Sequence, residues 1–196
     1  NYATMDLVKD IVPIKNRYIN ACNHLDSQVG RILTYLREHQ LMDSTVVLVT
    51  GDHGEEFMEK GHWGHNSGFR EEETRPPLVL WVPGKGHQEI TRMTSHLDIP
   101  ATLMPLMGVT NPPRDYSLGY DLLGNTHRDF TVICDWNHVA YVDEHYKLSM
   151  PFNVYGFAEQ KITLRDDSPV TDLSAFNADN KQRLTRLMTD MKAFSR

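Results

Sequence analysis

Cysteine is scarce in this chain. Only Cys22 and Cys134 occur among 196 residues, and they lie far apart in no metal-binding spacing. This excludes a disulfide framework and leaves the redox compartment undefined. A surplus of basic residues is also missing, since the net charge is −6 and the isoelectric point is about 5.9. A nucleic-acid-binding surface needs a basic patch, so we expect no nucleic-acid partner.

Long apolar stretches are absent as well. No run approaches the ~20 apolar residues of a membrane-spanning helix. Residues 1–10 lack the basic start and apolar centre of a signal peptide. A length of 196 residues is enough for one domain with a core and a small addition. We expect the larger part at residues 1–125 and the smaller part at residues 126–196.

Two short apolar runs are present, at Val46–Thr50 and Leu78–Val82. Continuous runs rich in β-branched residues predict strands that are buried on both faces, as in a parallel sheet. Apolar residues recur at helical spacing over Arg17–His39 and Asp98–Met107. The predicted fold class is therefore α/β, with a mostly parallel sheet flanked by helices and with both runs as inner strands.

The ends of the chain give further expectations. Residues 1–16 show no clear period, and Pro13 should break any helix there. Cys22 lies on the apolar stripe of the first helix and is expected in the core. After residue 126, a small antiparallel sheet is predicted. Its strands are expected at Phe130–Cys134, Val139–Tyr141, Lys147–Ser149 and Ile162–Leu164, followed by a closing helix at Ala178–Phe194.

A cluster of polar residues follows the first apolar run. Asp52 and His53 come directly after its end, between two glycines, and Glu55, Glu59 and His65 follow. Open α/β sheets bind ligands at the carboxyl ends of their strands, and carboxylate and imidazole are good ligands for a divalent metal. A turn with an Asx hydrogen bond uses the same residues, however, and loop histidines can simply be solvated. The local chemistry leaves these interpretations equally open.

The order of motifs along this stretch resembles the sulfatase branch of the alkaline phosphatase superfamily. The similarity spans about Tyr18–Leu123 and departs from the family pattern at one place, where Lys60 replaces a histidine and His62 lies two positions further on. The matching motifs are Asp52-His53-Gly54-Glu55, Glu59-Lys60-Gly61, Trp63-Gly64-His65, Phe69-Arg70-Glu71-Glu72, Arg75-Pro76-Pro77-Leu78, Pro83-Gly84 and the segment Asp98–Leu103.

The resemblance implies a sulfatase-like α/β fold with a small C-terminal antiparallel sheet and a closing helix. It implies a divalent metal (zinc, manganese, magnesium or calcium) with Asp52 and His53 as ligands. His65 would be the catalytic residue that faces the anion or the leaving group. Lys60 and His62 would contact the substrate.

The nucleophile of that family is missing here. Neither Cys22 nor Cys134 starts the family's Cys/Ser-x-Pro-x-Arg motif, and no paired aspartates follow an N-terminal strand. The chain therefore resembles the C-terminal half of a larger catalytic domain. Metal binding would need the N-terminal half, and this chain alone is expected to be inactive, because two protein ligands rarely hold a metal.

Within the branch, the sequence is most similar to sulfatase-like proteins of the Gram-negative inner membrane. This implies a periplasmic domain, an N-terminal membrane region, and an anionic ester or an acidic lipid such as cardiolipin or lipopolysaccharide as ligand. Two functions stay open. The full-length protein is a metal-dependent hydrolase of phosphate or sulfate esters, or it is a catalytically degenerate fold that binds lipid or a membrane-protein partner in envelope regulation.

Overall fold

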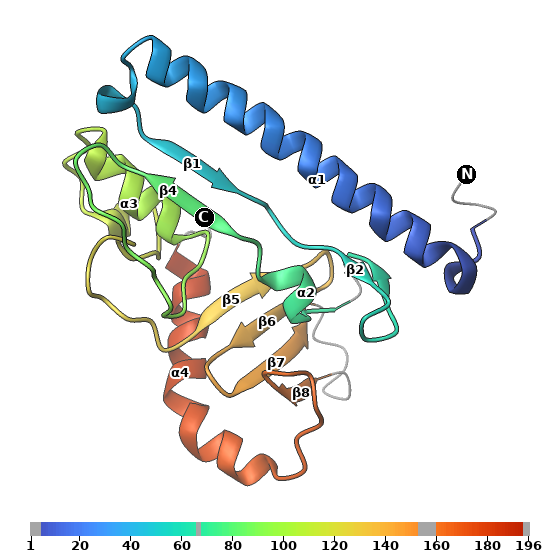
Figure 1. Ribbon diagram of the computed structural model, residues 1–196. Helices are drawn as coiled ribbons and strands as arrows, with labels where there is room; N and C mark the ends of the chain where they lie inside the picture. Colours follow the sequence, from blue (N-terminus) through green and yellow to red (C-terminus); the bar gives the residue numbers. More distant parts are fainter. Residues whose placement is uncertain (1–4, 66–67, 153–159, 194–196) are drawn as a thin grey trace. The chain divides into compact units, whose positions relative to one another are not determined.

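The computed structural model describes residues 5–65, 68–152 and 160–193 (Figure 1). The chain forms two compact units, residues 1–87 and residues 88–196. The boundary expected between residues 125 and 126 falls inside the second unit. There Arg128, on one side of that boundary, forms an ion pair with Asp98 on the other side. None of the described helices is both long enough and apolar enough to cross a bilayer.

The first unit opens with a long helix, α1 (Leu7–Glu38). It begins well before the predicted start at Arg17, and Pro13 lies inside it. The carboxylate of Asp6 caps the helix by accepting hydrogen bonds from the backbone N–H groups of Val8 and Lys9, at 3.1 and 3.3 Å. Proline removes only one helical hydrogen bond, a local cost of ~3 kcal/mol. The helix continues through Pro13 to Glu38 in spite of this cost.

No described residue of α1 is buried, and Cys22 is exposed rather than in the core. The apolar stripe exists as predicted, but Leu25 in its middle is 62% exposed. Helical spacing shows which residues share a face and carries no information on whether that face is covered. The prediction that Cys22 is buried was therefore wrong, because the spacing of apolar residues does not show whether their face is covered.

The two apolar runs form strands β1 (Val47–Thr50) and β4 (Leu78–Trp81). They pair with each other in antiparallel register, with Val47 opposite Trp81 and Thr50 opposite Leu78. The expectation for these two strands was different, namely inner positions in one mostly parallel sheet. Val79 is 64% exposed, and among the described residues this sheet has two strands. An apolar run indicates a strand but does not determine whether that strand pairs in parallel or antiparallel direction. In the described part of the chain, side chains of this sheet such as Val79 remain exposed to solvent.

Residues 51–77 form an excursion between β1 and β4, whose described residues include three short elements. Strands β2 (Glu56–Phe57) and β3 (Trp63–Gly64) form a small antiparallel hairpin, with Glu56 opposite Gly64. The short helix α2 (Glu71–Thr74) follows. A 3-10 turn, η2 (Met42–Ser44), precedes β1.

The second unit confirms the small antiparallel sheet and the closing helix. Helix α3 (Asp98–Leu106) matches the predicted helix, and a 3-10 turn, η3 (Pro113–Asp115), follows. The four-stranded sheet runs in the order β5-β6-β7-β8, and helix α4 starts earlier than predicted, at Leu173. The bounds are β5 (Thr131–Cys134), β6 (His138–Val142), β7 (Tyr146–Pro151), β8 (Lys161–Leu164) and α4 (Leu173–Ala193).

The core of the second unit lies between this sheet and α4. Its buried residues come from both elements: Phe130, Tyr141, Leu148, Phe176 and Leu187. The hydroxyl of Tyr141 donates to the buried Asp143 carboxylate at 2.8 Å. Burial and this carboxylate raise the pKa of Tyr141, so the hydroxyl keeps its proton.

Candidate functional site

The candidate site lies where β1 ends. Thr50 is the last residue of the strand, and its hydroxyl donates to the backbone carbonyl of Pro77 at 2.9 Å, which joins the two ends of the excursion. Gly51, Asp52, His53 and Gly54 follow immediately. Asp52 and His53 are thus held at the carboxyl end of a paired strand, as the sequence predicted.

His53 and His65 come together at this end of the strand. Their ring centroids lie 4.4 Å apart, with 34° between the ring planes. Nδ1 of His53 lies 2.8 Å from the carbonyl oxygen of Gly54. A carbonyl can only accept, so the proton is on Nδ1 and the Nε2 lone pair is available to a ligand. This is how many metal-binding histidines are held.

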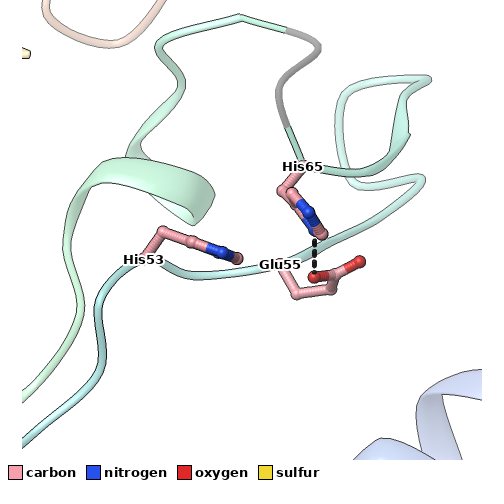
Figure 2. Close-up of side chains that lie close together, drawn as sticks. All are labelled: His53, Glu55 and His65. Atoms are coloured by element: carbon pink, nitrogen blue, oxygen red, sulfur yellow. Dashed lines mark hydrogen bonds and ion pairs between the residues drawn. The ribbon is translucent and has the colours of Figure 1, made fainter. Parts of the chain in front are cut away.

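Glu55 is the third member of the group, and no role was predicted for it from the sequence. Its Oε2 accepts from Nδ1 of His65 at 3.0 Å. Figure 2 shows both imidazole rings directed toward the Glu55 side chain. One ligand atom from each of His53, Glu55 and His65 lies within 4.8 Å of the others. The three side chains could therefore share a metal ion.

The hairpin register explains why Glu55 meets His65. Glu56 pairs with Gly64, and Phe57 pairs with Trp63. One step further out, Glu55 and His65 fall opposite each other, where cross-strand side chains lie close together. The hairpin turn depends on left-handed backbone at Met58 (φ 68°) and Gly61 (φ 79°). A glycine is an expected signal for such a turn, whereas a methionine with positive φ is not.

Asp52 lies beside this group with its side chain 91% exposed. Its Oδ1 accepts from the backbone N–H of His53 at 3.0 Å, and its Oδ2 lies 3.7 Å from Nε2 of His53. The hydrogen bond from the His53 N–H, with smaller help from the histidine charges, lowers the pKa of Asp52. The carboxylate is therefore ionised at neutral pH and can face a cation beside His53. It does not belong to the three side chains with converging ligand atoms.

The two predicted substrate residues lie in the hairpin turn between β2 and β3. Nζ of Lys60 is 3.5 Å from a carboxylate oxygen of Glu72. His62 is exposed, and its backbone carbonyl accepts from the N–H of Met58 at 2.8 Å in the hairpin turn. The structure thus brings His53 and His65 together, with Asp52 adjacent, and places Lys60 and His62 on the turn.

A buried ion pair helps to hold the backbone of the site in place. Glu56 is fully buried, and its Oε1 lies 3.3 Å from a guanidinium nitrogen of Arg70. Burial raises the pKa of Glu56, the Arg70 charge opposes this shift, and the buried Glu73 carboxyl adds to it. The backbone N–H of Gly54 also donates to the carbonyl of Glu73 at 2.7 Å. The segment between His53 and Glu56 is therefore held on both sides of Glu55, by α2 and by Arg70, the residue that precedes α2.

The long helix also contacts the excursion. Nζ of Lys15 on α1 donates to Glu59 at 2.6 Å. The ring of Tyr18 lies 5.0 Å from the ring of Phe57, on β2. The first unit thus holds the hairpin from α1 as well as from α2.

Comparison with known proteins gives a consistent result. The family profile described as Sulfatase matches residues 4–109, more than half of the chain. The inner membrane protein YejM of Salmonella typhimurium is 35% identical over 108 residues, which cover 54% of this chain and 18% of that protein. Human iduronate 2-sulfatase is 40% identical over 72 residues, which cover 37% of this chain and 13% of the enzyme. The choline-sulfatase of Rhizobium meliloti is 31% identical over 111 residues, covering 56% and 22%.

Solved structures show the same fold. A putative sulfatase from Bacteroides thetaiotaomicron superimposes with a TM-score of 0.68 at 19% identity, covering 90% of this chain and 44% of that protein. A protein solved with its substrate D-glucosamine-2-N,6-O-disulfate gives 0.64 at 19% identity, covering 86% and 38%. The matches to the three sequence relatives cover 18%, 13% and 22% of those proteins, so the chain spans about a fifth of their length. The α/β fold with its small antiparallel sheet and closing helix is shared with these structures.

Proposed function

Because this chain belongs to the sulfatase family, we propose that it supplies the C-terminal part of a metal-dependent site that hydrolyses sulfate or phosphate esters. The observation that carries the proposal is the convergence of His53, Glu55 and His65 at the end of β1, with Asp52 beside them. These residues belong to the segment that the family profile covers. The iduronate 2-sulfatase and the choline-sulfatase are named for the hydrolysis of sulfate esters.

The residues present fit a divalent metal ion. His53 keeps its Nδ1 proton in a hydrogen bond to Gly54 and so offers Nε2. The ionised Asp52 carboxylate lies 3.7 Å from that nitrogen and would be the second ligand. A bound ion would supply positive charge to the non-bridging oxygens of the ester. Two ligands are fewer than the three or four that protein metal sites use, so the remaining ligands and the nucleophile would come from the N-terminal half.

His65 is the proposed catalytic residue of this chain. Glu55 accepts the Nδ1 proton of His65 and orients its ring, and the ring faces His53. An imidazole in this position can donate a hydrogen bond or a proton to an anionic ester. Lys60 and His62 lie on the hairpin turn and would contact more distant parts of the substrate. The 3.5 Å pair with Glu72 partly neutralises Lys60, which makes it the weaker contact.

The test compares the isolated 196-residue chain with a longer protein that carries the family's N-terminal half. Turnover of p-nitrophenyl sulfate and p-nitrophenyl phosphate is measured with zinc, manganese, magnesium or calcium. We expect metal-dependent turnover only from the longer protein, with strong losses on Asp52→Ala and His53→Ala. His24→Ala, an exposed histidine on α1, is the matched control. Turnover by the short chain, or turnover in the longer protein that survives Asp52→Ala and His53→Ala, would contradict the proposal.

A second candidate is a binding role without catalysis. It is favoured by the match to YejM, an inner membrane protein, over 54% of this chain. In this role the chain would be a periplasmic domain of an inner-membrane protein that binds acidic lipid or a membrane-protein partner. Flotation with cardiolipin vesicles against phosphatidylcholine vesicles tests it. The net charge of −6 opposes non-specific binding to anionic vesicles, so specific retention would be informative.

A further inference from the structure

We propose that His53, Glu55 and His65 form a binding site for one late first-row divalent cation of the zinc class, which this chain holds by itself. The site differs from the Asp52–His53 pair of the proposed function because it uses Glu55 and His65 and does not need Asp52. Binding requires no turnover and no other part of a larger protein. Only its regulatory consequence, given below, rests on the proposed function.

The geometry brings three good ligands within reach of one ion. Ring nitrogens of His53 and His65 and a carboxylate oxygen of Glu55 lie within 4.8 Å of one another. Two ligands of a tetrahedral zinc ion lie about 3.4 Å apart, because Zn–N and Zn–O bonds are ~2.0–2.2 Å long. The most distant pair would have to close by about 1.4 Å (4.8 minus 3.4). The two histidine side chains are 44% and 45% exposed, so their rings have room to rotate by that amount.

The backbone under the three ligands is already fixed. Glu55 and His65 continue the β2–β3 register, so their separation is set by a hairpin and not by a free loop. On the other side, the N–H of Gly54 is bound to Glu73, and Glu56 is anchored on Arg70. A ligand set on a supported backbone loses less conformational freedom on binding than one on a mobile loop. Glu55 is the least exposed of the three, with 23% of its side chain accessible.

The donor set selects the class of metal. Two imidazoles and one carboxylate match the three protein ligands of many zinc sites, with a fourth position open to water. Imidazole nitrogen favours zinc, copper, nickel and iron, whereas magnesium and calcium prefer oxygen ligands. We therefore expect zinc to bind and magnesium and calcium to bind only weakly. Asp52 points to solvent beside the group and is not required.

Such an ion would regulate the proposed active site. It would use His53, which the proposed function also needs, and it would occupy His65, the proposed catalytic residue. The two arrangements therefore exclude each other. If the proposed function holds, micromolar zinc should lower turnover in the presence of excess magnesium or manganese.

The test is a zinc titration of the 196-residue chain, followed by calorimetry and by competition with a chromophoric chelator. Cobalt absorbance serves as a second probe of the ligand geometry. We expect one equivalent of zinc to bind, with affinity falling more than about tenfold in Glu55→Gln and His65→Asn, since loss of even outer-shell partners costs 10–100-fold. His24→Asn, an exposed histidine on α1, should bind zinc as the wild type does, and Asp52→Asn should still bind one equivalent of zinc. Far-UV circular dichroism confirms that each variant is folded.

Three results would overturn the inference: no zinc binding at a 1:1 ratio, binding that survives Glu55→Gln and His65→Asn, or binding lost in Asp52→Asn. The last would assign the ion to the Asp52–His53 pair instead. None of these measurements depends on hydrolysis. A failure of ester turnover in the longer protein would leave the zinc result standing, and a failure of zinc binding would leave the ester proposal to its own assay.

Discussion

Replacing Gly54 by alanine should disturb the candidate site and destabilise the first unit. Gly54 lies between His53 and Glu55, and its N–H donates to the backbone carbonyl of Glu73 at 2.7 Å. A Cβ at this position would lie 1.9 Å from the backbone carbonyl oxygen of Glu72. The close approach of α2 that provides the hydrogen bond therefore leaves no room for a side chain.

The size of the effect follows from these distances. An ordinary contact begins near 3.4 Å, so the backbone must separate by about 1.5 Å (3.4 minus 1.9). Overpacking of this kind costs ~1–3 kcal/mol, and the lost hydrogen bond adds ~0.5–1.5 kcal/mol. We expect the free energy of unfolding of the first unit to fall by about 2–4 kcal/mol. Zinc affinity should fall by at least about tenfold, since His53 and Glu55 both move relative to His65.

Urea unfolding followed by tryptophan fluorescence measures the stability change, because Trp63 and Trp81 both lie in the first unit. Gly30→Ala is the control. Gly30 lies in α1 with no atom within 4 Å of an added Cβ, so alanine should raise stability by ~0.5–1 kcal/mol. An unchanged unfolding midpoint and zinc affinity in Gly54→Ala would refute the reasoning.

Four further changes test the buried charges and the Cys134 thiol. Asp98→Asn leaves the buried Arg128 without its ion pair and should destabilise the second unit by about 3–5 kcal/mol in thermal unfolding, whereas Asp115→Asn, on the surface, should have almost no effect. Arg70→Met leaves the buried Glu56 unpaired and should destabilise the first unit by a similar amount at pH 7. Burial raises the pKa of the Glu56 carboxyl above its ordinary 4.5, so the folded state binds the carboxyl proton more tightly than the unfolded state does. The free energy of unfolding therefore falls as pH rises from 4.5 through the raised pKa. Urea midpoints between pH 4 and pH 8 should show a flatter slope in Glu56→Gln, and an unchanged slope would argue against this account. Burial and Asp135 raise the pKa of the Cys134 thiol above 9.0, so in a Cys22→Ser background its reaction with Ellman's reagent should still accelerate above pH 9, and a plateau below that pH would contradict it.

The sequence predicted the parts of the fold that depend on local pattern. The strands β5 to β8 and the helix α3 were expected close to where they lie, since each has a clear period or turn signal. An apolar run has the same sequence pattern in parallel and antiparallel pairing, so the direction of β1 relative to β4 could not be predicted from it. The start of α1 was missed because Pro13 received more weight than the capping signal at Asp6.

The candidate site was predicted in part for a similar reason. The resemblance placed Asp52, His53 and His65 in one site, and the structure brings the two histidine rings to 4.4 Å between centroids with Asp52 beside them. Their catalytic and metal-binding roles stay predictions. Glu55 belongs to the same motif, but its contact with His65 depends on a hairpin register. That register requires a left-handed methionine at position 58, for which the sequence has no recognisable signal.

The hydrogen bond from Thr50 to Pro77 has an evolutionary consequence. It closes the excursion at its base, between residues 27 positions apart, and the β1–β4 pairing begins immediately beside it. Everything between these two residues can change in length or composition while the sheet below keeps its register. Selection could therefore exchange one set of ligands and substrate contacts for another without redesigning the domain. A transplant of residues 51–77 onto the same two strands of a related protein should carry its chemistry with it.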